Sequence, residues 1–201
     1  MKIIGLCGGS GSGKGSVAKM FLNFNIPGVD ADCVYHELTD KPSECLSELC
    51  SEFGNEILNT EGGLDRAALG KIVFYGDGAE ERRKRLNAIS HKHVLMKIRE
   101  IISEYKEKDY PAVIVDAPLL FESGFNTECD LIILVVAERE TRIRRIVERD
   151  GVTPSLAEKR IDTQIPDEEL KSRVDYVIDN SGALAKTYGQ VTKITKELLK
   201  R

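Results

Sequence analysis

The residues from Gly8 to Lys14 have the types and the spacing of a phosphate-binding loop. They read Gly-Gly-Ser-Gly-Ser-Gly-Lys and match the pattern G-x-x-x-x-G-K. Glycine removes side chains that would keep backbone N–H groups away from a triphosphate, and a lysine adds a charge that reaches the β- and γ-phosphates. We expect this loop to bind a triphosphate.

The flanking residues support this interpretation. Lys2 to Cys7 form a short apolar run with the length of a buried strand, and helical apolar spacing follows from Ser16 to Leu22. A flexible glycine-rich linker is the alternative, but linkers are not bracketed by a buried strand and an amphipathic helix. The following helix points its positive end at the anion.

One position departs from the pattern. The residue after the lysine is usually Ser or Thr, whose hydroxyl ligates Mg²⁺, but here it is Gly15, followed by Ser16. Adjacent helix residues point about 100° apart, so Ser16 cannot simply replace the missing ligand. We expect magnesium binding to be affected more than phosphate binding.

Aspartates follow two further predicted strands. Asp30 and Asp32 come after a strand expected over 26–29, and Asp116 ends the apolar run from Ala112 to Val115. Carboxyl ends of strands beside a phosphate loop are where open α/β sheets bind ligands. In extended chain Asp30 and Asp32 project to one side, where either can accept a proton or hold Mg²⁺ through water. Helix capping is the alternative for Asp30 and for Asp116.

Arginines are concentrated in a predicted helix that follows the fourth strand. Arg142, Arg145 and Arg149 share a face next to an apolar stripe, and Arg160 lies on the next helix. Arginines that close over a triphosphate neutralise charge as the phosphoryl group transfers. Because glutamates are interleaved with these arginines, a solvated basic helix is an equally open interpretation.

The stretch from Val34 to Tyr110 is predicted to be mostly helical and to be inserted between the second and third strands. It contains Arg66 and His91, which can reach a bound anion. The cluster Arg82 to Arg85 is either a solvated face or a phosphate site.

Composition narrows the class of protein. The chain has 201 residues and a net charge of −4, which argues against broad binding to nucleic acid. Its apolar runs are too short to span a membrane, and it begins on a core strand, so we expect no signal peptide. The chain has five cysteines, an odd number, and no two of them form a C-x-x-C pair. This pattern predicts neither a disulfide framework nor a zinc site, and we expect reduced thiols in a cytoplasmic protein.

The alternation of strands and helices predicts a single α/β domain over 1–201. We expect a three-layer P-loop fold of the nucleoside-monophosphate-kinase type, with a parallel five-stranded sheet, an inserted helical substrate lobe and a helical lid. The predicted core covers about 1–32, 111–137 and 170–201, the lobe about 33–110, and the lid about 138–169. These parts suggest a small-molecule kinase.

Over nearly its full length the sequence resembles the dephospho-CoA kinase family. Besides the glycine loop, the resemblance rests on segments that occur in the same order in the family. They are Asp30-Ala31-Asp32, Leu64-Asp65-Arg66, Ile72-Val73-Phe74, Asp116-Ala117-Pro118-Leu119-Leu120-Phe121-Glu122, Cys129-Asp130, Arg149-Asp150-Gly151, Arg160-Ile161, Gln164, and Asp175-Tyr176-Val177-Ile178-Asp179-Asn180.

The resemblance implies transfer of the γ-phosphate of ATP, with Mg²⁺, to the 3′-hydroxyl of the small molecule dephospho-CoA, the last step of coenzyme A biosynthesis. It implies catalysis by Asp32, Lys14 and Asp116, a grip on dephospho-CoA by Asp32, Arg66 and His91, and metal binding by Asp32 and Asp116, partly through water. The residues implied in ATP binding are Gly11, Ser12, Gly13, Lys14, Gly15, Ser16, Arg142, Arg149 and Asn180.

Two positions differ from the family pattern. Gly15 replaces the usual hydroxyl residue, and Lys92 stands where the family usually has proline after its histidine. Two alternative functions stay open at this point. One is another small-molecule kinase of the same fold, and the other is an ATP-binding regulator that Gly15 has made inactive. The sequence carries no signal for an oligomeric state.

Overall fold

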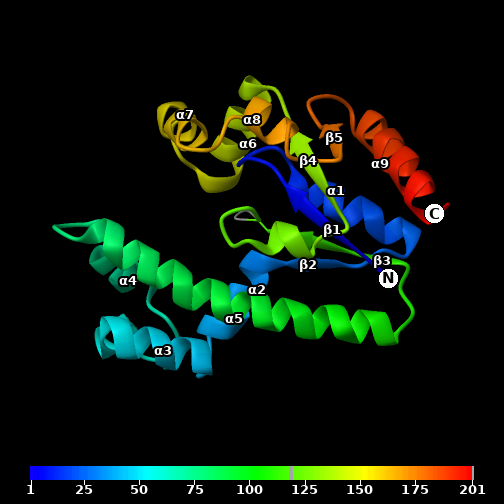
Figure 1. The fold of residues 1–201 in the computed structure, drawn as a ribbon. Helices are drawn as coiled ribbons and strands as arrows, with labels where there is room; N and C mark the ends of the chain where they lie inside the picture. Colours follow the sequence, from blue (N-terminus) through cyan, green and yellow to red (C-terminus); the bar gives the residue numbers. More distant parts are fainter. Residues whose placement is uncertain (118–119, 201) are drawn as a thin grey trace. The chain divides into compact units, whose positions relative to one another are not determined.

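The computed structural model describes residues 1–117 and 120–200, so Pro118, Leu119 and Arg201 lie outside the described residues. Pro118 and Leu119 belong to one of the expected family segments. The described part of the chain forms a five-stranded sheet in the order β2-β3-β1-β4-β5 (Figure 1). The strands are β1 (Lys2–Cys7), β2 (Gly28–Asp30), β3 (Ala112–Asp116), β4 (Leu131–Val136) and β5 (Tyr176–Asp179).

Strand β1 pairs in parallel with β3 and β4, and β4 pairs in parallel with β5. The predicted α/β fold with its five-stranded sheet is therefore confirmed. The helices are α1 (Lys14–Phe21), η1 (Leu22–Phe24), α2 (Ala31–Thr39), α3 (Glu44–Phe53), η2 (Asn55–Ile57), α4 (Arg66–Phe74), α5 (Ala79–Glu107), η3 (Phe125–Glu128), α6 (Arg139–Asp150), α7 (Pro154–Asp162), α8 (Asp167–Lys171) and α9 (Leu184–Leu199).

Two strand boundaries differ from the sequence prediction. The second strand was expected over 26–29 and covers Gly28–Asp30, while the fifth was expected over 174–178 and covers Tyr176–Asp179. At the fifth strand, the side chain of Asp175 accepts a hydrogen bond from Ile132 N at 2.7 Å, where a strand would offer a backbone carbonyl. The side chain of Asp175 thus replaces a backbone carbonyl in the pairing with β4, and the spacing of apolar residues gives no sign of such a replacement.

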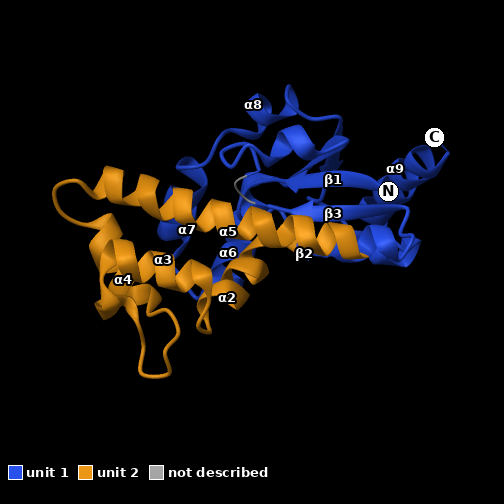
Figure 2. Ribbon diagram, turned by 60° about the horizontal axis from the view of Figure 1, so that its bottom comes forward, with its two compact units in different colours: residues 1–29, 105–201 blue, residues 30–104 orange. Residues whose placement is uncertain are grey.

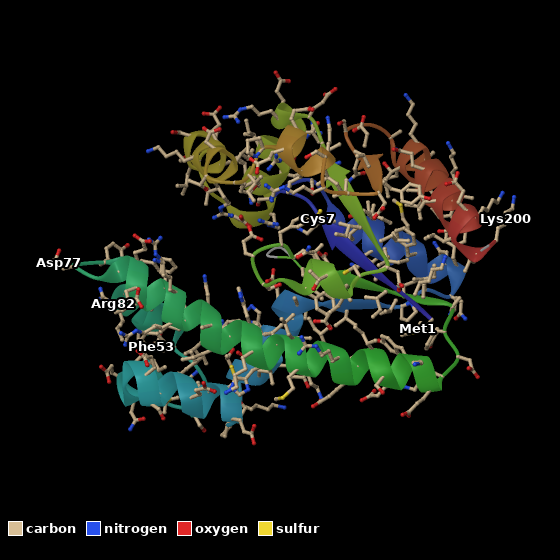
Figure 3. All side chains as sticks on the ribbon, viewed as in Figure 1. Met1, Cys7, Phe53, Asp77, Arg82 and Lys200 are labelled. Atoms are coloured by element: carbon tan, nitrogen blue, oxygen red, sulfur yellow. The ribbon has the colours of Figure 1, made fainter. Side chains whose placement is uncertain are left out.

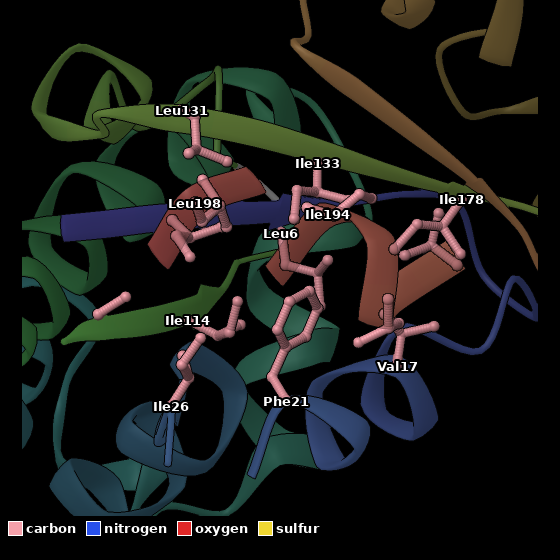
Figure 4. Packing of buried hydrophobic residues seen from close by; sticks show 14 residues of the cluster. Leu6, Val17, Phe21, Ile26, Ile114, Leu131, Ile133, Ile178, Ile194 and Leu198 are labelled. Carbon is pink, nitrogen blue, oxygen red and sulfur yellow. The ribbon is translucent and has the colours of Figure 1, made fainter. Parts of the chain in front are cut away.

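One face of the sheet packs against α1 and α9 (Figure 4). Val17 and Phe21 from α1, and Val191 from α9, have no exposed surface. They meet inward-facing strand residues such as Ile114 and Ile133. The buried face of α1 holds the helix against the sheet, so the loop before it is anchored at both ends.

The described residues form two compact units, coloured separately in Figure 2. Unit 1 comprises Met1–Val29 and Tyr105–Arg201, and unit 2 comprises Asp30–Glu104. Unit 1 contains the phosphate loop and nearly all of the sheet. The bounds predicted above for the core, the lobe and the lid stay predictions.

Unit 2 has its own apolar core, in which Leu49, Ile57 and Val73 are fully buried. Arg82, labelled in Figure 3, donates hydrogen bonds to the carbonyl oxygens of Ile72, Tyr75 and Asp77 at 2.6, 2.7 and 2.8 Å. These bonds satisfy carbonyls at the end of α4 and in the turn that follows it, which the helix itself does not pair. This member of the basic cluster therefore has a structural role.

Within the described parts of the chain, no helix combines the length and the apolar character needed to cross a membrane.

Candidate active site

The register of the sheet brings Asp116 to the start of the phosphate loop. Leu6 on β1 is paired with Asp116 on β3, so the two strands end side by side. Because β1 is central in the sheet, its loop begins between the neighbouring strands β3 and β4. This is the carboxyl edge at which parallel α/β sheets bind ligands.

The loop has a backbone shape that needs glycine. Gly8, Gly11 and Gly13 have φ angles of 144°, 77° and 89°, a region that L side chains rarely adopt. Gly13 is also the residue that precedes α1, and no side chain among the described residues caps this helix. The first-turn N–H groups of α1 are thus suited to an anionic ligand.

Lys14 and Asp116 lie together under this loop. The ammonium nitrogen of Lys14 is 3.9 Å from Asp116 Oδ1 and donates to the carbonyl oxygen of Gly8 at 3.1 Å. Their side chains are only 15% and 12% exposed. A lysine and a carboxylate are therefore held together beside the loop, and their roles towards a triphosphate stay predictions.

Arg145 and Asn180 hold the outer side of the loop. Arg145 donates to the carbonyl oxygens of Gly11 and Ser12, both at 3.2 Å, and to that of Asn180 at 2.9 Å. The buried amide of Asn180 donates to Ser12 O at 2.8 Å and accepts from the hydroxyl of Thr187 at 2.9 Å. These bonds satisfy the carbonyl oxygens of Gly11 and Ser12 and fix the backbone of the loop.

Arg142 is buried against the same loop, with 7% of its surface exposed. Its Nε donates to Ser10 O at 2.9 Å. Burial lowers the pKa of its guanidinium, since the charged form loses hydration. In this arrangement the side chain supports the loop, and its predicted contact with ATP stays a prediction.

Arg149 lies further along α6 and pairs with its neighbour. Its guanidinium donates to both carboxylate oxygens of Asp150, at 2.7 and 2.9 Å, and Arg160 pairs with the same carboxylate. The Arg149 hydrogen bond, helped by Arg160, lowers the pKa of Asp150 to about 2. The two arginines are thus gathered on one carboxylate, and contact of Arg149 with ATP is likewise untested.

The structure corrects the prediction for Asp30 and Asp32. Extended chain ends at Asp30, and α2 begins at Ala31, so the two side chains do not alternate along a strand. Asp30 Oδ1 accepts from the N–H groups of Asp32 and Cys33 at 2.9 and 3.1 Å. Asp30 is therefore the N-cap of α2, which decides between the two open alternatives for this residue. Asp32 is an exposed residue in the first turn of α2.

The two residues expected to grip the acceptor also belong to unit 2. Arg66 begins α4 and donates to Thr39 Oγ1 at 3.1 Å and Asp40 Oδ1 at 2.8 Å, at the end of α2. Asp32 is at the start of that helix, about 10 Å away along its axis by the usual rise per residue. His91 is half-buried on α5.

Arg145 and Gln164 contact the loop. Sequence reasoning named Arg145 as one of several arginines that could close over a triphosphate, and Gln164 as part of the family resemblance without a role. Gln164 accepts a hydrogen bond from Ser10 N at 2.9 Å. The i, i+3 spacing of Arg142 and Arg145 was a usable signal that both face the same partner. For Gln164 the family resemblance marked the position, but no local spacing indicated its partner, because its contact with the loop joins residues 154 positions apart.

Comparison with known proteins agrees with this geometry. The profile of the dephospho-CoA kinase family matches residues 2–186. The sequence is 38% identical over 188 residues to the dephospho-CoA kinase of Shouchella clausii, covering 94% of each chain. It is 36% identical over 194 residues to that of Bacillus cereus, covering 96% of each.

Solved structures give the same result. A protein of Thermus thermophilus, TT1252, superposes with a TM-score of 0.81 at 31% identity, covering 98% of this chain and 97% of its own. Dephospho-CoA kinase from Campylobacter jejuni superposes with a TM-score of 0.72 at 26% identity, with the same coverage. Shikimate kinase from Acinetobacter baumannii, at 14% identity and a TM-score of 0.56, shares the fold.

Two thiols lie close to the site, and their chemistry can be predicted. Burial raises the pKa of Cys7, at the end of β1 (Figure 3), and of Cys129 to about 12 in each case. At pH 8 about one such thiol in ten thousand is a thiolate, the form that reacts. Cys33 on α2, by contrast, is exposed.

We therefore expect iodoacetamide at pH 8 to alkylate Cys33 first and to leave Cys7 and Cys129 unmodified. Peptide mass mapping over a time course measures the rates, and a sample unfolded in urea, in which all five cysteines react, is the control. Equal rates at Cys7 and Cys33 in the folded protein would contradict the burial argument.

Proposed function

The chain belongs to the dephospho-CoA kinase family, and from this premise we propose which residues carry its reaction. The enzyme transfers the γ-phosphate of ATP to the 3′-hydroxyl of dephospho-CoA and releases CoA and ADP, the last step of coenzyme A biosynthesis. The observation that best supports the assignment of roles is the Lys14–Asp116 pair beside a glycine-built cradle at the carboxyl ends of β1 and β3.

We propose that Gly11 to Ser16 bind the ATP phosphates through backbone N–H groups and that Lys14 neutralises charge on the β- and γ-phosphates. The positive end of α1 adds to this attraction. Charge on the transferring group grows towards the transition state, so fixed positive groups at this place lower the barrier. Contacts of Arg142, Arg149 and Asn180 with ATP are part of the same proposal.

Asp32 is proposed as the group that orients the 3′-hydroxyl and accepts its proton during in-line transfer. Two features support this choice over Asp30. Asp30 Oδ1 caps α2, which gives Asp30 a structural role, and Asp32 is an exposed residue in the first turn of that helix. Arg66 and His91 are proposed to bind dephospho-CoA, because both are basic side chains in the unit that carries Asp32.

Magnesium is proposed as the partner of ATP. Mg²⁺ in kinases is held by one or two carboxylates together with substrate phosphates and waters. The donors present fit such a site: Asp116 lies at the loop, and within the described residues no group of three or more His, Cys, Asp or Glu forms a closed metal site. Asp116 and Asp32 would hold the ion, partly through water, and the ion would offset negative charge on the phosphates.

We further propose that the enzyme acts in the cytoplasm and that its partners are small molecules rather than nucleic acid or membrane.

The reaction is tested by measuring ADP release from Mg-ATP with dephospho-CoA and, in parallel, with a panel of nucleosides, nucleotides and sugars. We expect ADP formation to depend on dephospho-CoA. Preferred turnover of another acceptor would contradict this assignment, and ATP binding without turnover of any acceptor would favour an inactive, ATP-binding regulator.

The role of Asp32 predicts that Asp32→Asn lowers turnover by roughly 10²–10⁴-fold, the usual contribution of general-base catalysis, with ATP affinity little changed. Steady-state kinetics and nucleotide titration provide both values. Asp30→Asn is the matched control, because asparagine caps a helix about as well as aspartate, and it should keep near wild-type turnover. Near wild-type turnover of Asp32→Asn would remove Asp32 from this role.

Gly15 generates a prediction about magnesium. Apart from its chain neighbours and the backbone of its own helix, no atom of the described residues lies within 4 Å of the position that a Cβ would take at Gly15, so there is room for serine. Gly15→Ser restores the missing hydroxyl and should lower the magnesium concentration that gives half-maximal rate. Gly15→Ala adds the same carbon without the hydroxyl, and its magnesium curve should stay as in the wild type. Identical curves for the two variants would show that the hydroxyl has no effect.

A further inference from the structure

Ser10 of the phosphate loop is held by both of its backbone groups. Its N–H donates to Gln164 Oε1 at 2.9 Å, and its carbonyl oxygen accepts from Arg142 Nε at 2.9 Å. Arg142 Nη2 donates to the same Gln164 Oε1 at 2.8 Å, which closes a ring of three hydrogen bonds. We call Ser10, Arg142 and Gln164 the loop clamp. Its two side chains come from α6 and from the residues that follow α7.

The polar groups of the clamp are largely buried, so each of them depends on its hydrogen-bond partners in the protein. Arg142 is 8% exposed at its side chain, and its Nη1 lies 3.6 Å from Asp167 Oδ2, itself 22% exposed. A guanidinium that has lost its water needs a partner for each donor, and removal of one partner leaves a costly unpaired group. Small movements of Gln164 would therefore be passed on to Ser10.

Two glycines of the loop are needed because of this approach. A Cβ on Gly9 would lie 2.1 Å from Arg142 Nη2 and 2.8 Å from Gln164 Oε1. A Cβ on Gly11 would lie 2.6 Å from the carbonyl oxygen of Arg142. At Gly11 the clash is with the backbone of α6, so this glycine leaves room for that helix. At Gly9 the clash is with the ends of the Arg142 and Gln164 side chains, so a larger residue there would displace the clamp.

The segment on the other side of the clamp is itself a packed unit. Ile146 of α6 and Ala157 of α7 are fully buried, and Ile161 completes their small core. Gln164 follows this core by three residues, so its position is set by the α6–α7 packing. The clamp thus connects the packing of the predicted lid with the backbone of the loop.

We propose that Gln164 is a positioning residue for phosphoryl transfer: through Oε1 it fixes Ser10 and Arg142, and thereby keeps the loop in the shape that binds the phosphates of ATP. This inference rests on the proposed role of the loop as the phosphate site. It assigns to Gln164 no contact with the reacting atoms.

The acceptor atom Oε1 is the part of Gln164 that matters, because both of its bonds are accepted there. Gln164→Glu keeps an oxygen at this place and adds a charge that suits Arg142. Gln164→Leu has a similar size without an acceptor and leaves Ser10 N–H and an Arg142 donor unpaired. The pair of variants separates the hydrogen bonds from simple space filling.

The test measures the dissociation constant of Mg-ATP by calorimetry, and the KM values for ATP and dephospho-CoA by steady-state kinetics. For Gln164→Leu we expect the ATP dissociation constant and the KM for ATP to rise about tenfold, the loss expected for one to two buried hydrogen bonds. The KM for dephospho-CoA should stay unchanged. Gln164→Glu should bring both ATP values back to within a few-fold of the wild type.

Asp162→Asn is the matched control. It weakens the exposed pair between Arg139 Nη1 and Asp162 Oδ1, at 2.7 Å, which also connects α6 with α7 but does not touch the loop. This variant should bind ATP as the wild type does. If it weakened ATP binding as much as Gln164→Leu, the effect would come from loosened helix packing and the proposal would be wrong.

Wild-type ATP binding by Gln164→Leu, or equal increases in both KM values, would also overturn the proposal. If Gln164→Leu does not fold, as judged by circular dichroism and thermal melting, Gln164→Asn takes its place. It keeps an amide but shortens its reach by one methylene, and it should raise the KM for ATP alone, whereas an unchanged KM would contradict the clamp. The dissociation constant of Mg-ATP is measured without dephospho-CoA. The clamp can therefore be tested even if dephospho-CoA were not turned over.

Discussion

The shape of the backbone between β1 and α1 is the constraint on which the rest of unit 1 depends. Three glycines with positive φ give this loop its turns. The carbonyls of Gly11 and Ser12 accept hydrogen bonds from Arg145. A backbone in this form has few contacts of its own, because it forms neither a helix nor a strand. Its stability must come from the groups around it, and polar backbone groups that are left without partners are costly.

Those groups come from distant parts of the chain. Arg142 and Arg145 on α6, together with Asn180 after β5, donate to the carbonyls of Ser10, Gly11 and Ser12. Positive charge therefore lies behind the loop as well as in Lys14, and it adds to the field in which a triphosphate would bind. Arg142 and Arg145 thus both hold the backbone of the loop and add positive charge beside it. Removing either one would affect the shape of the loop and the local charge together.

Membership in the dephospho-CoA kinase family gives the reaction, while Gly15 distinguishes this chain from the usual family pattern. Among the described residues, nothing outside its own helix crowds a Cβ at Gly15, so packing there does not explain the glycine. The carboxylate of Asp116, 3.9 Å from the ammonium nitrogen of Lys14, is one of the two groups that we propose as magnesium ligands.

Much of this protein could be predicted from the sequence alone, because the evidence was local. The apolar runs predicted all five strands, and the glycine spacing predicted the loop between β1 and α1. The resemblance to the dephospho-CoA kinase family rested on short segments in a fixed order, and the family profile agrees with it. Asp116 could be placed next to the loop because parallel strands end at one edge of a sheet.

Tertiary structure decided the questions that depend on which distant groups meet. Asp30 is a local exception, because its cap bonds come from N–H groups two and three residues ahead, and the sequence had left this outcome open beside a role in the site. The arginines of α6 share one face, but only packing determined that Arg142 and Arg145 hold the loop while Arg149 pairs with Asp150. Gln164 reaches Ser10 across 154 positions of sequence, and no periodicity within one helix or strand carries information about such a contact.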